Sequence, residues 1–132
     1  MKFNKLALLS LPSLLLCSCG PVSSFKATIL VTTNHTNTCS MSFDEFDGTY
    51  VFKVKKINPG EGTISYTASL EEGTINVSYI DALTKDEQHL FMLSNGDSIS
   101  GNNGYIEKGY RVKIVIRSVG KAKNGKFTFD LN

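Results

Sequence analysis

The chain contains no tryptophan and only two histidines among its 132 residues. Tryptophan is the largest aromatic side chain available for stacking, so its absence weakens the case for a sugar-binding surface. The two histidines, His35 and His89, lie far apart in the sequence and, with one spare cysteine, are too few for the four ligands of a zinc site. His35 lies four residues from Cys39, but two such positions in an extended segment do not form a catalytic pair. We therefore expect neither a zinc site nor an enzyme.

No apolar run is long enough to cross a bilayer. The longest covers residues 6–16 and is interrupted by two serines and a proline, whereas a spanning helix needs about 20 apolar residues. Lys2 and Lys5 precede this run and small residues follow it. A positive start, a short apolar core and small residues after it are typical of a secretory signal peptide. We therefore expect the protein to be exported and this segment to be removed.

The sequence Leu16-Cys17-Ser18-Cys19, at the end of the apolar run, resembles the lipobox of bacterial lipoproteins. In that family a leucine stands three positions before an invariant cysteine, and a small residue stands directly before it. The resemblance implies that the Cys19 thiol receives a diacylglyceryl group, that a peptidase cuts before Cys19, and that the new amino group can accept an acyl chain. Cys17 is the alternative lipidation site, although the bulky Leu16 suits the position next to the cut poorly. An ordinary signal peptide with incidental cysteines is the other alternative.

The same resemblance implies where the protein is found. Two or more acyl chains hold a protein stably at a bilayer, whereas a single chain binds only marginally. The protein is then anchored to the bacterial cell membrane or to an outer membrane, facing away from the cytoplasm, with the membrane as its partner. Gly20 is not the aspartate that retains lipoproteins at the inner membrane in Gram-negative members of the family. Beyond the lipid on Cys19 we expect no cofactor.

Neither sign of charge is in excess once the signal is removed. The whole chain has 14 Lys and Arg residues against 12 Asp and Glu, but Lys2 and Lys5 belong to the signal, so the mature chain is neutral. A neutral body lacks the basic face that the phosphates of nucleic acids require, so we expect no nucleic-acid partner. Neutrality also argues against electrostatic docking to the membrane.

From Phe25 onward the apolar residues alternate with polar ones, a period of two that indicates β-strands. Turn residues divide the chain into expected strands over 26–33, 38–46, 49–57, 63–70, 74–80, 88–94, 109–119 (the longest) and 126–131, with one or two more within 95–108. The strands 63–70 and 74–80 are expected to form a hairpin, because a short loop ending in Gly73 joins them. Cys39, the one cysteine outside the signal and the lipobox, is expected to be buried, with an intermolecular disulfide or an exposed thiol as alternatives.

Eight or nine short strands, with a turn signal about every ten residues, predict an all-β fold. An antiparallel β-sandwich is expected, with a barrel as the alternative. Three stretches, 73–81, 109–116 and 125–129, resemble small β-sandwich accessory modules such as the bacterial pre-peptidase C-terminal domain, and are similar to small sandwich lipoproteins of Gram-positive bacteria. In these folds a Gly-x-Phe motif, here Gly125-Lys126-Phe127, closes the final hairpin. The resemblance implies a module that binds or assists rather than one that catalyses.

Two groups of oxygen-bearing side chains are weak candidates for binding calcium, which prefers about six to eight oxygen ligands. Neither group has the spacing of a calcium loop, and for both a solvated turn is the simpler interpretation, so we expect no metal site. The groups are Asp44, Glu45 and Asp47 before a glycine, and Asn95, Asp97, Asn102 and Asn103.

A ligand site is a further hypothesis for the segment in which Tyr105 and Tyr110 flank an Asn/Gly-rich loop containing Asn102 and Asn103. Aromatic rings can stack on sugars, and amides can hydrogen-bond their hydroxyl groups. Tyr110, however, also falls on the core face of its expected strand. A small basic tip that could contact an anionic wall polymer is formed by Lys121, Lys123 and Lys126.

Our first hypothesis is a membrane-anchored, non-enzymatic lipoprotein of the cell envelope whose β-sandwich binds an envelope protein or glycan. A carbohydrate or wall-polymer binding module is the second hypothesis. A small β-barrel lipoprotein that binds a lipid or inhibits an enzyme is the third. The expected parts are a signal peptide over residues 1–18, the lipidated Cys19 with a short tether over 19–25, and a β-sandwich domain over 26–132.

Overall fold

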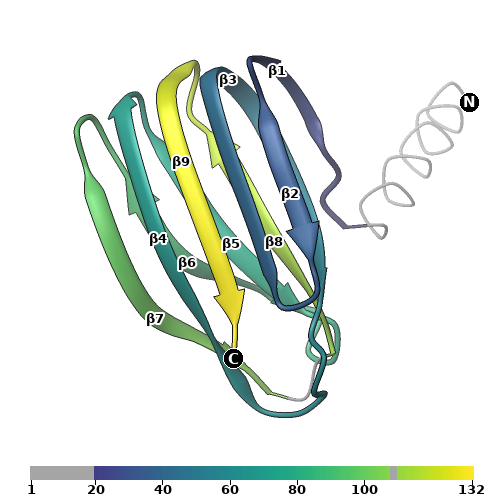
Figure 1. The fold of residues 1–132 in the computed structure, drawn as a ribbon. Helices are drawn as coiled ribbons and strands as arrows, with labels where there is room; N and C mark the ends of the chain where they lie inside the picture. The colour runs from purple at the N-terminus through teal and green to yellow at the C-terminus, as the bar shows by residue number, and fades with distance from the viewer. Residues whose placement is uncertain (1–19, 108–109) are drawn as a thin grey trace, which may run out of the picture.

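The computed structural model describes residues 20–107 and 110–132, and every regular element within them is a β-strand (Figure 1). The nine strands are β1 (Ser24–Thr28), β2 (Val31–His35), β3 (Thr38–Lys55), β4 (Gly62–Glu72), β5 (Ile75–Asp81), β6 (Glu87–Leu93), β7 (Ser98–Ile106), β8 (Arg111–Ser118) and β9 (Ala122–Leu131). All of their pairings are antiparallel. Within these ranges no helix is long and apolar enough to span a bilayer. The expected all-β fold is confirmed.

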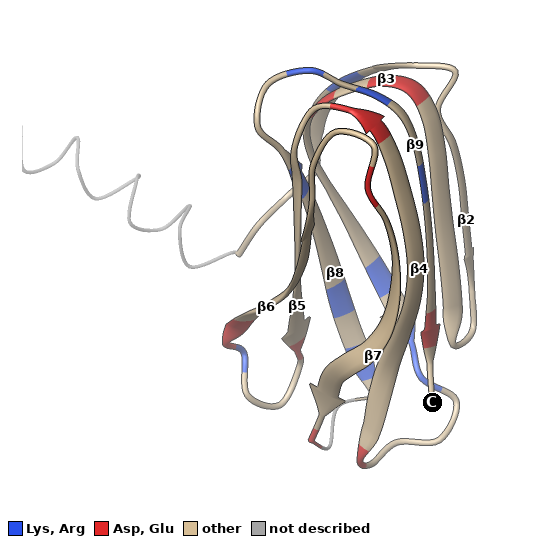
Figure 2. Ribbon diagram, turned by 90° about the vertical axis from the view of Figure 1, so that its left-hand side faces the viewer, with Lys and Arg blue, Asp and Glu red and all other residues tan. Residues whose placement is uncertain are grey.

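The strands form one sheet that folds back on itself as a β-sandwich, in the order β6-β5-β8-β3-β9-β4-β7 (Figures 1 and 2). β3 belongs to both layers, because residues 38–46 pair with β9 and residues 49–55 pair with β8. We call the first half of β3 with β9, β4 and β7 the β9 layer. We call the second half of β3 with β8, β5 and β6 the β8 layer. β1 and β2 pair with the other edge of β3.

β3 continues through the position at which we expected a strand to end. Its 18 residues cover both of the strands expected over 38–46 and 49–57. Gly48 lies where the partner of β3 changes from β9 to β8, and its φ of 136° is accessible mainly to glycine. This glycine therefore bends the strand between the layers instead of ending it. β3, and not the segment 109–119, is the longest strand.

β4 and β5 do not form the expected hairpin. β4 pairs with β7 and β9, while β5 pairs with β6 and β8, so the two strands lie in opposite layers. Gly73, with a φ of 102°, lies in the turn that carries the chain from one layer to the other. A strand shows the same alternation of apolar residues in either layer, so the pattern that predicted both strands could not identify their partners.

The first expected strand, 26–33, is divided into β1 and β2. Ile29 has a φ of 49°, a left-handed conformation that is unfavourable for a β-branched residue and interrupts the extended backbone. Ile29 and Val31 are alternate residues of the expected strand 26–33, and both side chains are exposed, at 70% and 56%. β2 extends to His35, two residues beyond the end of the expected strand 26–33.

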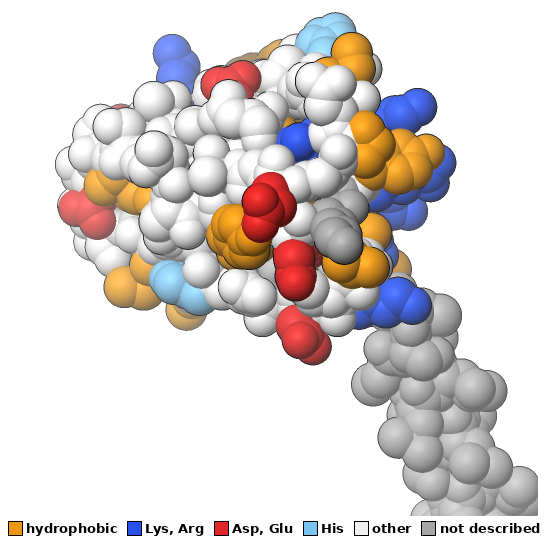
Figure 3. Space-filling model, turned by 90° about the horizontal axis from the view of Figure 1, so that it is seen from below, with side chains coloured by type: hydrophobic (Ala, Val, Ile, Leu, Met, Phe, Trp, Pro, Cys, Tyr) orange, Lys and Arg blue, Asp and Glu red, His pale blue; other side chains and the backbone are white. Residues whose placement is uncertain are grey.

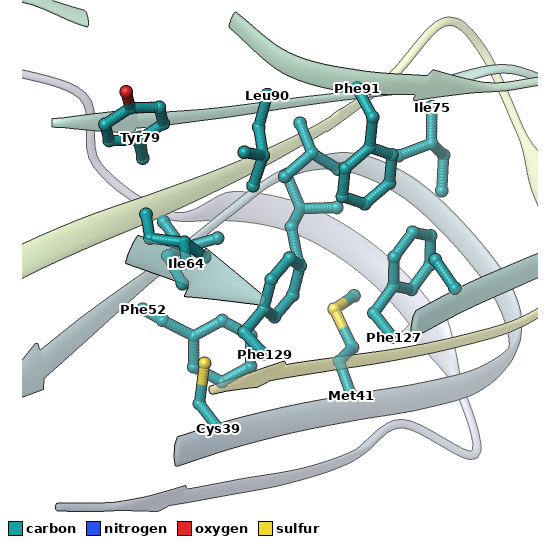
Figure 4. Close-up of a cluster of buried hydrophobic side chains, with 14 of the residues drawn as sticks. Cys39, Met41, Phe52, Ile64, Ile75, Tyr79, Leu90, Phe91, Phe127 and Phe129 are labelled. Atoms are coloured by element: carbon teal, nitrogen blue, oxygen red, sulfur yellow. The ribbon is translucent and has the colours of Figure 1, made fainter. Parts of the chain in front are cut away.

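The hydrophobic core lies between the layers and is built from alternate residues of the strands (Figure 4). The ring of Phe91 from the β8 layer stacks on Tyr66 of the β9 layer at 4.3 Å between centroids, and it lies 6.1 Å from the ring of Phe129. Cys39 is fully buried, as expected, and burial raises the pKa of its thiol well above the ordinary value. The largest side chains with almost no exposure are Met41, Phe46, Phe52, Ile64, Leu70, Ile75, Leu93, Ile106, Ile114, Ile116, Phe127 and Phe129.

We expect Gly48→Ala to destabilise the protein much more than Gly60→Ala. The two glycines have nearly the same φ, 136° and 133°, so the backbone strain of about 1–3 kcal/mol is similar in both variants. A Cβ at residue 48 would lie 2.3 Å from the Ser24 carbonyl oxygen, whereas residue 60 has open space around it. The clash would separate β1 from β3. Urea denaturation measures both free energies of unfolding, and equal losses would contradict the close packing of β1 on residue 48.

Candidate functional site

Cys19, the expected lipidation site, lies outside the described residues, as do Cys17 and the rest of the lipobox. The described chain begins at the next residue, Gly20, where an added Cβ would lie 3.7 Å from the Lys113 Nζ on β8. Ser23, three residues later, accepts a hydrogen bond through its Oγ from the Val51 backbone N–H of β3, at 2.9 Å. The first described residues therefore lie against the β8 layer.

A groove of about 420 Å³ lies on the outer face of this layer, where β3, β8 and the end of β5 meet. Ile80 and Ala82 contribute apolar surface to it. The core residues of β3 and β8 alternate with the cations of the same strands, so these cations point outward. We call this site the cationic groove, and its charged residues are Lys53, Lys55, Arg111 and Lys113.

The four cations oppose one another across the two strands. Lys53 of β3 is directly opposite Lys113 of β8, and Lys55 is directly opposite Arg111. Figure 2 shows neighbouring blue bands, which mark Lys and Arg residues, on adjacent strands of the β8 layer. Like charges directly opposite each other on adjacent strands destabilise a sheet. The described residues form two ion pairs, and neither includes a cation of the groove.

The remaining arginine of β8 is neutralised. Arg117 donates hydrogen bonds from both terminal nitrogens to the Glu87 carboxylate, the second at 3.1 Å. These hydrogen bonds lower the pKa of Glu87 and raise that of Arg117, since each holds the other in its charged form. Positive charge on the outer face of the β8 layer is therefore concentrated at the cationic groove.

Tyr110 lies beside the groove. Its ring centroid is 5.7 Å from the Lys55 Nζ and 5.6 Å from the Arg111 Cζ, distances at which a ring attracts a cation. Its side chain is 41% exposed, so the expectation that Tyr110 lies on the core face of its strand is wrong. β8 begins only at Arg111, and the backbone carbonyl of Tyr110 instead accepts a hydrogen bond from the Lys56 N–H at 2.8 Å.

The asparagines of the expected ligand segment have different environments. Asn103 makes two hydrogen bonds within the protein. Its Oδ1 accepts a hydrogen bond from the Tyr66 hydroxyl at 2.7 Å, and its Nδ2 donates one to the Leu90 carbonyl at 3.0 Å. Asn102 is exposed on the same strand, β7. The exposed Asn103 side chain therefore links β7 to β4 and β6 through both of its amide atoms.

Of the two tyrosines of that segment, Tyr105 lies on a strand of the β9 layer and Tyr110 directly precedes a strand of the β8 layer. Tyr105 is on β7, where its ring is 51% exposed and its hydroxyl donates a hydrogen bond to the Glu61 Oε1 at 2.7 Å. This bond to a carboxylate raises the pKa of Tyr105. Tyr110 directly precedes β8 and contacts the cationic groove. Tyr105 therefore shares β7 with Asn102 and Asn103, whereas Tyr110 lies next to β8 in the other layer.

The oxygen-bearing candidates do not converge either. Asp44 and Asp47 are exposed, and Glu45 forms an ion pair with Lys121, with 3.7 Å between the Glu45 Oε1 and the Lys121 Nζ. In the second group, the Asn95 Oδ1 accepts a hydrogen bond from the Gly73 N–H, and the Asp97 Oδ2 accepts one from the Ser94 N–H, so both side chains stabilise turns. Within residues 20–107 and 110–132, no group of three His, Cys, Asp or Glu side chains is close enough to hold a metal ion.

His35 and Cys39 are not combined into a catalytic pair. His35 is exposed at the end of β2, whereas Cys39 is fully buried on β3. His89 is exposed on β6.

The cations of the groove, by contrast, were not identified from the sequence. Their signal was the alternation of Lys53 and Lys55 with core residues, but only the pairing of β3 with β8 brings them next to Arg111 and Lys113.

No known protein family matches the sequence, and no curated protein has a matching sequence. Among solved structures, the fold is similar to TmCBM61 in complex with β-1,4-galactotriose, with 15% identity and a TM-score of 0.53 over 87% of this chain and 92% of that chain. It is also similar to a pre-peptidase C-terminal domain of collagenase from Bacillus anthracis (13% identity, TM-score 0.48, 76% and 91% of the two chains). A mutant of a carbohydrate-binding module of family 29 has 9% identity and a TM-score of 0.45, over 82% and 77%. At 15% identity, the similarity to TmCBM61 supports the β-sandwich fold alone.

We expect Lys53→Gln to stabilise the protein at low ionic strength. The substitution removes repulsion between Lys53 and Lys113, and a cross-strand pair of this kind changes the free energy of unfolding by about 0.2–1 kcal/mol. The gain should shrink as salt screens the repulsion. Lys126→Gln on β9 is the matched control and should leave the stability unchanged. Urea denaturation at two salt concentrations measures both, and a loss of stability in Lys53→Gln at low salt would mean that Lys53 has a compensating partner.

Proposed function

We propose that this protein is an exported, lipid-anchored binding domain of the bacterial cell envelope, with Cys19 as its lipidated residue. The proposal rests on the lipobox sequence from Leu16 to Cys19. The structure is compatible with a short anchor, because β1 begins at Ser24, only five residues after Cys19. A lipid on Cys19 holds the sandwich close to the surface of the bilayer.

The cationic groove is the observation that favours binding as the activity of the sandwich. It combines four positive side chains with apolar surface and the exposed ring of Tyr110. Such a site attracts an anionic ligand and offers contact area for its apolar part. The protein therefore acts by holding an anionic component of the envelope and not by transforming a substrate.

Metabolic labelling with a palmitate analogue tests the anchor. We expect label on the wild-type protein and on Cys17→Ala, and no label on Cys19→Ala, because only the lipobox cysteine presents its thiol for the lipid. The two single variants are matched controls for each other. If Cys19→Ala is labelled and Cys17→Ala is not, the lipidated residue is Cys17. If the wild-type protein is not labelled, the proposal is wrong.

Carbohydrate binding is a second candidate function, favoured by the exposed ring of Tyr105 beside Glu61. A ring stacks on the apolar face of a sugar, and a neighbouring carboxylate accepts hydrogen bonds from its hydroxyls. The solved structure of TmCBM61 contains β-1,4-galactotriose, so a sandwich of similar shape can carry a sugar site.

A glycan array with the lipid-free domain, residues 20–132, tests this second candidate. If this candidate function is correct, the domain binds neutral oligosaccharides on the array. Tyr105→Ala should then weaken binding at least tenfold, since stacked aromatic rings contribute most of the binding energy at such sites. Tyr110→Ala is the control and should bind these sugars as the wild type does. If the domain binds no neutral sugar on the array, or if the two substitutions reduce binding equally, Tyr105 is not the residue that stacks on the sugar.

A further inference from the structure

We infer that the cationic groove docks onto anionic phospholipid headgroups of the membrane to which Cys19 is anchored. The inference deepens the proposed function and rests on it, because the anchor is what brings the groove to the lipid. It also revises the conclusion drawn from the neutral mature chain. The net charge of the mature chain is zero, but the fold places four cations together on the outer face of one layer.

The charges of the groove lack compensation within the described residues. Lys53 and Lys113 are directly opposite each other, as are Lys55 and Arg111, and the ion pairs that the structure describes lie elsewhere. Lys53, Lys55 and Arg111 are exposed, and Lys113 is partly exposed, so all four can reach a partner. Phosphate groups of a membrane surface supply the missing negative charge. Each Lys or Arg near the surface strengthens membrane binding about fivefold.

Exposed apolar side chains beside the groove favour a membrane over a soluble polyanion. Tyr110 is 41% exposed, Leu83 is 53% exposed and Ile57 is 63% exposed. Two backbone hydrogen bonds hold their loops against the start of β8: the Lys56 N–H donates to the Tyr110 carbonyl, and the Ala82 N–H donates to the Arg111 carbonyl, at 2.8 and 3.1 Å. Seen from below, basic and apolar side chains gather along one flank of the molecule (Figure 3).

This combination matches the interface of a bilayer. Lys and Arg heads remain among the phosphates, while Leu, Ile and the ring of Tyr enter the region between headgroups and acyl chains. A soluble polyanion would gain nothing from the apolar side chains. The surface therefore has the chemistry of a membrane-contacting face and not only that of a general anion-binding site.

The start of the described chain lies at the same place. A Cβ at Gly20 would lie 3.7 Å from the Lys113 Nζ, and consecutive Cα atoms of any chain are only about 3.8 Å apart across a trans peptide bond. A lipid on Cys19 would therefore enter the bilayer beside the groove. Acyl chains and a basic patch then act as two membrane signals from one side of the domain, and together they bind more firmly than either does alone.

Docking in this way gives the protein a defined orientation. The outer face of the β8 layer would rest on the headgroups, and the outer face of the β9 layer, with the exposed Lys126, would point away from the membrane. The sandwich would thus be held flat at the bilayer instead of moving freely about residues 20–23.

Vesicle cosedimentation of the lipid-free domain, residues 20–132, tests the inference. Its hydrophobic core is built entirely from residues between 39 and 131, so the domain contains every side chain of that core. We expect binding to vesicles of phosphatidylglycerol mixed equally with phosphatidylcholine, and little binding to phosphatidylcholine alone. Binding should fall steeply at high salt, because exposed charges are then screened. Equal binding to both kinds of vesicle, or to neither, would overturn the inference.

Two double variants of equal net charge locate the surface. Lys53→Gln with Lys113→Gln should weaken binding about 25-fold, or about fivefold per cation, while Lys123→Gln with Lys126→Gln on β9 should change it less than twofold. Both control residues are exposed, and neither takes part in the two ion pairs of the described chain. Equal losses in the two double variants would mean that only net charge matters, and would overturn the assignment to the groove.

A third measurement separates a membrane from a soluble polymer. Leu83→Ser and Tyr110→Ser should each weaken vesicle binding severalfold, and inorganic polyphosphate should compete poorly. Strong competition by polyphosphate, with both serine variants binding as the wild type does, would identify the groove as a site for a soluble polyanion and reject the membrane. Palmitate label on Cys19 without vesicle binding would reject this inference alone, whereas absence of label would reject the proposed function.

Discussion

The backbone ladder along β3 is the constraint on which the rest of the structure depends. Each buried N–H and C=O of a strand needs a partner, and β3 finds partners in β9 and then β8 along one edge, and in β2 and β1 along the other. The change of partner at Gly48 turns one continuous strand from the first layer into the second. The two layers can therefore face each other, and the space between them becomes the core.

The same ladder creates the cationic groove. Phe52 and Val54 of β3 point inward, so Lys53 and Lys55 must point outward, and β8 alternates in the same way. Pairing of the inner residues therefore brings cations next to each other on the outside, where they repel. The gain from burying large apolar side chains exceeds the cost of this repulsion, since burial contributes about 1.5–3 kcal/mol per side chain and exposed like charges cost less than about 1 kcal/mol.

Alternation in the sequence was a sound guide to which residues face the core and a poor guide to strand partners. Cys39, Met41 and Phe43, which are alternate residues of the expected strand 38–46, are all buried. In β6, however, Leu90 and Phe91 are both buried although they are consecutive, because the register with β5 shifts between Val77 and Ser78. A bulge of this kind depends on the fit between two strands, so the sequence of one strand does not reveal it.

Two features of this protein could be inferred from its sequence alone: strands throughout the body, and a lipobox that predicts an anchor at Cys19. Both depend on short stretches, because side-chain alternation and the lipobox resemblance involve only residues close together in the chain. Strand partners, and with them the groove, were decided only by the tertiary structure. Lys53 and Lys113 are 60 positions apart, and they become neighbours because β3 pairs with β8 in the sandwich that buries the apolar faces of both strands.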